Sequence, residues 1–212
     1  VLAVIILMPC SSLLVNLACK LIKEDNKNEV QLLDERLLAT PSVAVERCKT
    51  VAKTMADVSV KSFKEALTLI DKYDAALSQK ISEDEDSVDM YEDKLGSYLV
   101  KISSKEISSE DSNNVNTLLH LIGDFERISD HAMNIAESAE EIHDKDLAFS
   151  PDAKRELSVV IGAINEILDL SLHAFCEGDL NAAVKVEPLE QVVDDLRDKL
   201  KKKHIARLQR NE

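Results

Sequence analysis

Apolar residues recur every three or four positions through most of the chain from residue 41 onward. Because an α-helix has about 3.6 residues per turn, this spacing places the apolar side chains along one helical face. The pattern predicts five long amphipathic helices. Their apolar positions begin, in chain order, at Cys48, Val88, Val115, Leu157 and Val184.

Local signals suggest where these helices begin. Thr40-Pro41 and Ser150-Pro151 each place a capping residue before a proline, so we expect the first and fourth helices to start there. The first is expected to extend to Leu77, and the third to follow residues 112–114. The fifth should follow Gly178-Asp179, with Pro188 kinking it or marking its true start.

The first part of the chain, Val1 to Cys19, carries no charge, and Lys20 and Lys23 follow it. As an α-helix this stretch would be about 28 Å long, close to the ~30 Å of a bilayer core. Lysines beside a span favour its cytoplasmic end. We therefore expect a transmembrane helix over residues 1–22 and a linker over residues 23–42. A signal or lipoprotein segment and a buried core helix are the alternatives.

The sequence contains an internal repeat with an offset of 105 residues, which aligns Asp74 with Asp179, Glu85 with Glu190, and Asp89 with Asp194. The first two helices thus recur as the fourth and fifth, whereas a counterpart of the third would lie past Glu212. We expect one three-helix bundle over residues 43–148 and a second, lacking its last helix, over residues 149–212.

Composition agrees with an all-α protein, since the chain has only four glycines, four prolines and no tryptophan. The formal net charge of −14 argues against nucleic acid as the main partner. The four cysteines form no Cys-x-x-Cys pair, and we interpret them as small buried apolar residues of a protein in a reducing compartment.

Three pairs of acidic residues lie four positions apart, so each pair shares one helical face. The pairs are Glu85 and Asp89, Glu126 and Asp130, and Glu190 and Asp194. Hard cations bind several carboxylate oxygens at once, so the six residues are candidate metal ligands, with iron or another divalent metal as the candidate ion. The alternative is an ordinary solvated surface, because such pairs often arise by chance in a chain with 40 acidic residues.

The run Glu126-Arg-Ile-Ser-Asp-His-Ala-Met-Asn-Ile-Ala-Glu137 resembles the signature of the PhoU family of phosphate-signalling proteins. That family is built of two three-helix bundles with repeated E(D)xxxD motifs, which all three acidic pairs match. The resemblance covers residues 43–212 and implies a PhoU-like fold and a regulatory role rather than catalysis.

The uncharged run followed by residues 33–41, LDERLLATP, resembles bacterial sodium/phosphate cotransporters of the type II-related family. There a PhoU-like domain follows the last membrane helix. This resemblance implies a cytoplasmic domain at the bacterial inner membrane, with the membrane part of the same transporter as partner and sodium and phosphate handled by that part. The paired Gln-Ser-Ser transport motifs of the family are absent from this chain. Self-association as a homodimer is a further expectation.

Two other functions stay open. One is a free-standing PhoU-type, metal-binding regulator of phosphate signalling. The other is a helical di-metal enzyme, which we discount because we expect none of the Glu-x-x-His motifs that such enzymes use.

Overall fold

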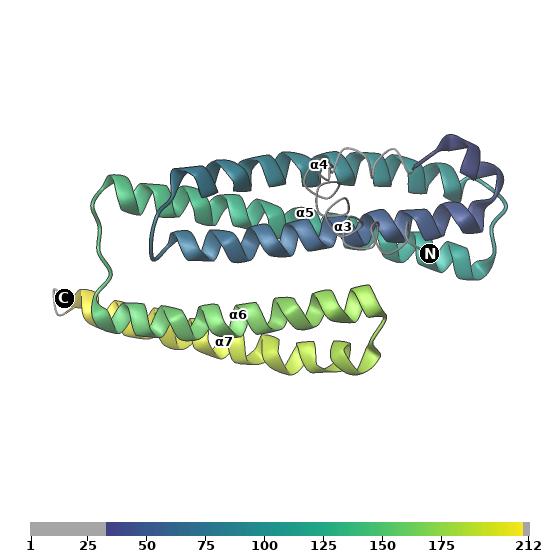
Figure 1. Ribbon diagram of the computed structural model, residues 1–212. Coiled ribbons are helices and arrows are strands. Elements are labelled where there is room, and N and C mark those ends of the chain that lie inside the picture. Colours follow the sequence, from purple (N-terminus) through teal and green to yellow (C-terminus); the bar gives the residue numbers. More distant parts are fainter. Residues whose placement is uncertain (1–32, 210–212) are drawn as a thin grey trace, which may run out of the picture.

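The computed structural model describes residues 33–209, and every regular element in that range is helical (Figure 1). This confirms the predicted all-α class. A short 3₁₀-helix, η1 (Glu35–Ala39), precedes five α-helices, which are α3 (Pro41–Leu69), α4 (Ala75–Ser103), α5 (Ser109–Asp144), α6 (Pro151–Glu177) and α7 (Leu180–Gln209). The expected transmembrane helix over residues 1–22, with Cys10 and Cys19, lies outside the described residues.

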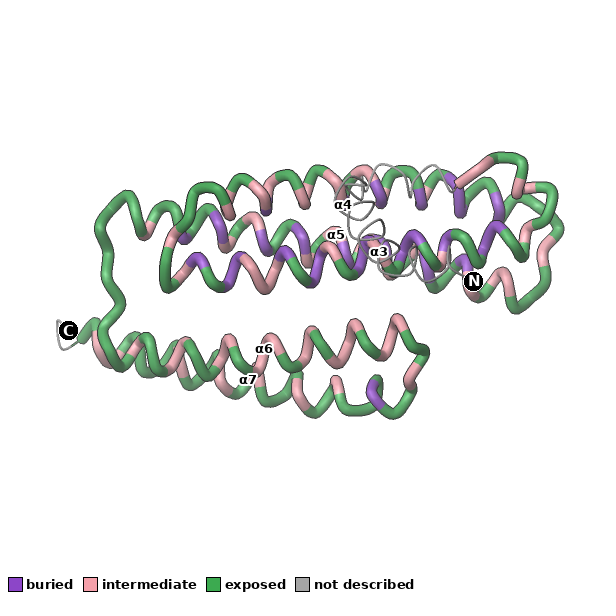
Figure 2. The backbone as a smooth tube through the Cα atoms, viewed as in Figure 1, coloured by how far each residue is buried: buried purple, intermediate pink, exposed green. Residues whose placement is uncertain are grey.

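Helices α3, α4 and α5 pack as a three-helix bundle whose apolar core consists of a larger and a smaller cluster of buried side chains (Figures 1 and 2). Each contributes the stripe of side chains that its periodicity predicts, and the centre includes Met55 of α3, Tyr91 and Leu95 of α4, and Ile122 of α5. At one end η1 covers the bundle, where the Tyr98 hydroxyl donates to the carbonyl oxygen of Asp34 at 2.7 Å. The three helices therefore bury the central side chains among themselves, and Leu172 and Phe175 of α6 pack against the same core from outside.

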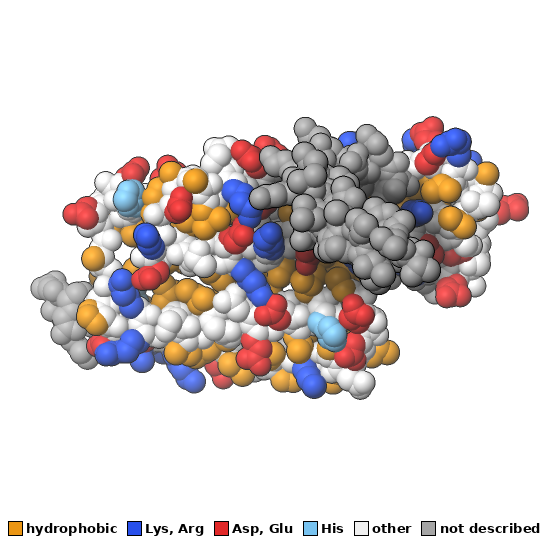
Figure 3. All heavy atoms as spheres, viewed as in Figure 1, with side chains coloured by type: hydrophobic (Ala, Val, Ile, Leu, Met, Phe, Trp, Pro, Cys, Tyr) orange, Lys and Arg blue, Asp and Glu red, His pale blue; other side chains and the backbone are white. Residues whose placement is uncertain are grey.

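Helices α6 and α7 form a hairpin that lies along α3. The hairpin buries far fewer of its own side chains than the bundle does. No residue of α6 and only Ala182 of α7 is buried (Figure 2). Hydrophobic side chains are visible along the hairpin surface (Figure 3). The Phe125 and Phe175 rings lie 5.1 Å apart where α6 meets the bundle. Ion pairs of Lys64 with Asp169 and of Lys154 with Asp71 also connect the bundle to α6.

Helix α6 is also the one helix among the described residues that is long and apolar enough to cross a bilayer, with a mean hydropathy of 1.5 in its most apolar window. Its side chains are partly or fully exposed among the described residues. Length and composition alone are weak evidence for a span, because core helices of soluble proteins meet the same criterion.

The start of α4 corrects the predicted end of the first helix. The carboxylate of Asp74 accepts hydrogen bonds from the amides of Ala76 at 2.9 Å and Leu77 at 3.3 Å, which is an N-cap. Helix α3 therefore ends at Leu69, and Leu77 belongs to α4. The apolar spacing runs across this turn without interruption, so periodicity alone could not reveal it.

The repeat aligned Asp74 with Asp179, and Asp179 caps α7 in the same way. Its carboxylate accepts from the amides of Asn181 at 2.9 Å and Ala182 at 3.3 Å. Equivalent positions in the two halves of the chain thus carry the same aspartate N-cap. Before it, Gly178 ends α6 with a φ of 68°, a left-handed conformation that glycine adopts without strain.

The other helix starts agree in part with the starts predicted from the sequence. Ser150 caps α6 as predicted, its hydroxyl accepting from the Ala153 amide at 3.2 Å. Pro41 begins α3, but the Thr40 hydroxyl donates back to the Leu37 carbonyl instead of capping the helix. Helix α5 begins at Ser109, before the predicted residues 112–114, because Ser108 provides the cap. Pro188 lies inside α7 and does not mark its start.

The core can be tested at two adjacent residues of α4. Leu99 is fully buried, whereas Val100 is 58% exposed. We expect Leu99→Ala to lower the free energy of unfolding by about 2–5 kcal/mol, since truncation of a packed leucine leaves a cavity. Val100→Ala should change it by less than about 0.5 kcal/mol. Urea unfolding followed by circular dichroism measures both, and equal losses would contradict the assignment of this core.

Candidate functional site

The bundle brings two of the three predicted acidic pairs together. Glu85 and Asp89 lie on α4 beside the buried Val88, and Glu126 and Asp130 lie on α5 beside the buried Phe125. Because the two helices pack against each other, the pairs flank the same seam. We call these four acidic residues the acidic cluster.

The pKa values show that the cluster acts as one electrostatic unit. Partial burial, followed by repulsion from Asp89, raises the pKa of Glu85, and Asp130 and Glu126 on α5 raise it further. The pKa of Asp89 is also raised, by partial burial and then by Asp130. The pKa of Glu126 is raised by partial burial, then Asp130, with Asp89 among the further causes. Each of these carboxylates is therefore repelled by charge on the opposite helix.

Three further acidic residues contribute to the same potential and were not predicted. Asp86 raises the pKa values of Glu85 and Asp89, Asp93 raises that of Asp89, and Glu92 raises that of Glu126. The four-residue spacing from Glu85 to Asp89 continues to Asp93, so one more turn of the same pattern would have found one of them.

The cluster has the chemistry of a cation site but not the geometry of a completed one. Its carboxylate oxygens are the ligands that hard cations prefer. Within residues 33–209, however, no three His, Cys, Asp or Glu side chains converge closely enough to hold an ion. The arrangement concentrates negative charge at the α4–α5 seam without forming a ligand shell.

The third pair stands apart from this cluster. Glu190 and Asp194 lie on α7, which packs mainly against α6 and not in the α4–α5 seam. The Asp194 carboxylate is 2.8 Å from the Arg197 guanidinium and so has a countercharge on its own helix.

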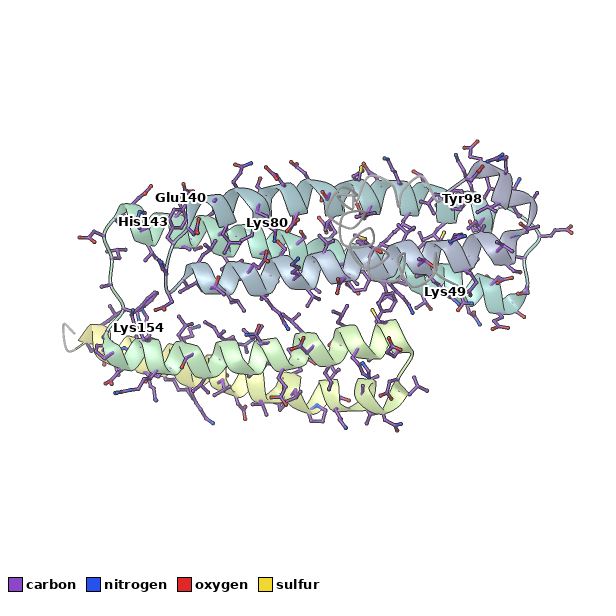
Figure 4. The ribbon with its side chains drawn as sticks, viewed as in Figure 1. Lys49, Lys80, Tyr98, Glu140, His143 and Lys154 are labelled. Carbon is purple, nitrogen blue, oxygen red and sulfur yellow. The ribbon has the colours of Figure 1, made fainter. Side chains whose placement is uncertain are left out.

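One Glu-x-x-His motif does occur, which corrects the expectation that the chain has none. Glu140 and His143 lie near the end of α5 (Figure 4). The His143 ring stacks on Tyr73 with ring centroids 4.9 Å apart. A di-metal bundle uses such motifs in pairs, and the sequence supplies this one alone.

The cysteines of the described region differ from each other. Cys48 is fully buried in the bundle core, as predicted, and burial raises the pKa of its thiol to about 12. Cys176 on α6 is only half-buried, since the hairpin covers its own side chains incompletely.

Comparison with known proteins relates this bundle to one family. Residues 52–139, from within α3 to the last turns of α5, match the PhoU domain family. The chain is 22% identical over 144 residues to the phosphate-specific transport system accessory protein PhoU homolog of Clostridium acetobutylicum, covering 67% of this chain and 64% of that protein. It is also 22% identical over 149 residues to PhoU homolog 1 of Thermotoga maritima, covering 70% of this chain and 63% of that protein.

The matched region spans less than two thirds of the length of either relative. No solved structure matches the chain significantly. The family match falls on the bundle that carries the acidic cluster. Together with the two relatives, it indicates that this chain contains a PhoU-like, all-helical domain related to phosphate transport accessory proteins.

Proposed function

We propose that this chain is a regulatory domain that modulates phosphate uptake through contacts between helices, without catalysing a reaction. The observation that carries the proposal is the PhoU match over residues 52–139, which coincides with the closed bundle of α3, α4 and α5. Both relatives are named as accessory proteins of phosphate-specific transport systems. An accessory role requires a stable surface for docking, and a closed bundle supplies one.

We further propose that the regulated protein is a sodium-dependent phosphate transporter of the bacterial inner membrane, with this domain on the cytoplasmic side. The uncharged run Val1 to Cys19, followed by Lys20 and Lys23, supports attachment to a membrane part of the same polypeptide. The competing function is a free-standing PhoU-type regulator, which would act on a separate transport system.

A second candidate function is cation binding at the acidic cluster. The favouring observation is that carboxylates on α4 and α5 raise one another's pKa values across the seam. A divalent cation, iron included, would relieve this repulsion if the side chains moved together around it. Glu190 and Asp194 lie on α7, away from the acidic cluster, and should bind little or none.

Phosphate uptake tests the regulatory role. Cells that lack the chain should take up labelled phosphate at a rate altered about five-fold or more when sodium is present, since coupling between sites commonly has that size. Uptake should be unchanged when choline replaces sodium. The same cells carrying Val100→Ala should behave like wild type, because Val100 is an exposed residue of α4.

The outcomes of that experiment separate the hypotheses. A change that is equal with and without sodium would favour the free-standing regulator, and no change in either medium would contradict a role in phosphate uptake. The neighbouring coding DNA gives an independent check. Several apolar spans upstream with paired Gln-Ser-Ser motifs would support the transporter, whereas a start codon immediately upstream would contradict it.

Metal analysis tests cation binding. Purified full chain should retain a divalent or ferric ion that the Glu126→Gln/Asp130→Asn double variant loses, because these two residues supply the α5 half of the acidic cluster. The matched Glu190→Gln/Asp194→Asn variant should keep the wild-type metal content. Equal content in all three proteins, or none in any of them across iron, zinc, manganese and magnesium, would leave the cluster as a plain acidic surface.

The pKa shifts predict a pH-dependent gain in stability for Asp130→Asn, which removes one of the repelling charges. Folded-state pKa values above the ordinary values mean that Glu85, Asp89 and Glu126 favour folding most when protonated, and this contribution is lost as pH rises through their folded pKa values. The variant should therefore raise the melting temperature by about 1–3 °C at pH 7.

Below about pH 4, where these carboxyls are protonated, the gain should disappear. Asp144→Asn at the end of α5 serves as the control and should change little at either pH. A gain of the same size at pH 4 and pH 7 would show that repulsion within the cluster is not its cause.

A further inference from the structure

The last three turns of α7 are strongly basic, whereas the rest of the helix is acidic. Residues 199–209, which we call the basic end of α7, contain five Lys or Arg residues and no acidic one, although the formal net charge of the chain is −14. Residues 180–198 contain five acidic and two basic residues. On the face seen in Figure 3, Lys and Arg side chains gather at the end of the hairpin where α6 begins and α7 ends. Positive charge is therefore concentrated at this end of the hairpin.

The acidic residues beside the basic end already have cationic partners. Glu156 of α6 lies 3.0 Å from the ammonium of Lys203 and 2.7 Å from the guanidinium of Arg207. Asp198, one residue before the basic end, lies 3.4 Å from the guanidinium of Arg197. Three lysines remain without an ion pair within residues 33–209, namely Lys199, Lys201 and Lys202. Their charge is therefore available to an external anion.

Apolar side chains lie beside these lysines on the side of α7 turned away from α6. The inner side is defined by Leu200, which lines a groove with Val160 of α6, and by the two cations that hold Glu156. At 100° per residue, five residues of the basic end point within about 75° of the opposite direction. They are Lys201, Lys202, Ile205, Leu208 and Gln209. The exposed fractions of Ile205 and Leu208 are 46% and 59%, so both side chains meet solvent.

This combination of side chains suits the surface of an anionic membrane. A helix that lies on a bilayer buries apolar side chains at the boundary of headgroups and acyl chains, while lysines around them meet anionic headgroups. Ile205 follows Lys201 by four residues and Lys202 by three, so it lies beside both on the helix surface. We propose that the outer face of the basic end of α7 docks on an anionic lipid bilayer.

The arrangement of the helices leaves this face free to approach a plane. Helix α7 packs against α6, α6 packs against α3, and α4 lies on the opposite side of the bundle from the hairpin (Figure 1). Helix α4 carries seven acidic and three basic residues, which an anionic bilayer would repel. With about 9 Å between packed helices, α4 lies roughly 25 Å from α7, or about three Debye lengths at physiological ionic strength. Its repulsion is therefore largely screened when α7 is the helix in contact.

This inference goes beyond the proposed function. Lipid binding would be a property of the basic end of α7 itself, whether or not the chain regulates phosphate uptake. It is also separate from any span over Val1 to Cys19, because the residues that carry it belong to another part of the chain.

Fluorescence labelling of the full chain tests which face meets the lipid. Ile205→Cys carries an environment-sensitive fluorophore, and the native cysteines other than Cys48 are replaced by serine. Cys48 can stay, because its thiol is fully buried with a pKa of about 12 and does not react. Phosphatidylglycerol vesicles should shift the emission to shorter wavelength, since residue 205 enters the headgroup region. The same label at Val100→Cys, on an exposed position of α4, should not shift.

The charge dependence is measured in the same labelled chain. Lys201→Gln/Lys202→Gln should need about twenty- to thirtyfold more anionic lipid for the half-maximal signal, because two lysines lose their contact with headgroups. The matched control is Lys94→Gln/Lys105→Gln, which changes two exposed lysines outside α7 that also form no ion pair within residues 33–209. This control should titrate like the labelled parent.

Four outcomes would overturn the proposal. They are an equal shift with phosphatidylcholine vesicles, an equal shift of the label on α4, equal titration by the two lysine variants, and no shift with either lipid. A shift with polyglutamate that vesicles do not produce would assign the lysines to an acidic protein partner and would also overturn it. Vesicle binding through residues 1–19 alone leaves the label on α7 unshifted, so it counts as a negative result.

Discussion

A single helix cannot hide its apolar stripe, and even two helices leave a half-open seam, so a closed core requires a third. In this chain α3, α4 and α5 meet that requirement, and their central residues, such as Met55, Tyr91 and Leu95, are fully buried. The hairpin of α6 and α7 does not meet it, although α6 is as clearly amphipathic as the helices of the bundle. The contrast between the two halves follows from the number of neighbouring helices and from the weaker amphipathic pattern of α7.

Closure of the bundle also creates its electrostatic character. The side chains that border a buried stripe are held near the adjacent helix, and in α4 and α5 several of these bordering residues are acidic. Glu85 and Glu126 are thus partly buried and held near like charges, and both effects raise their pKa values, burial more than repulsion. The core packing that stabilises the bundle therefore maintains the repulsion that makes the seam attractive to a cation.

The sequence predicted which segments are helical more accurately than where each helix ends. It also predicted the acidic pairs, but not which of them lie close together in the fold. Periodicity identifies a helical face, but the face of α3 continues in register across the turn that Asp74 caps, so Leu77 was placed in the wrong helix. The four-residue spacing predicted each acidic pair on one face. Which faces meet depends on the rotation of each helix within the bundle, and that rotation is set by packing among residues distant in sequence.

The two halves of the repeat share a cap, at Asp74 and Asp179, but the described residues cover their apolar side chains to different extents. In the first half α5 packs against both α3 and α4, so these three helices bury one another's apolar faces. In the second half α6 and α7 pack against each other, and α3 provides the main contact from outside the hairpin. Apolar burial stabilises in proportion to the area removed from water, so the bundle gains more from packing than the hairpin does.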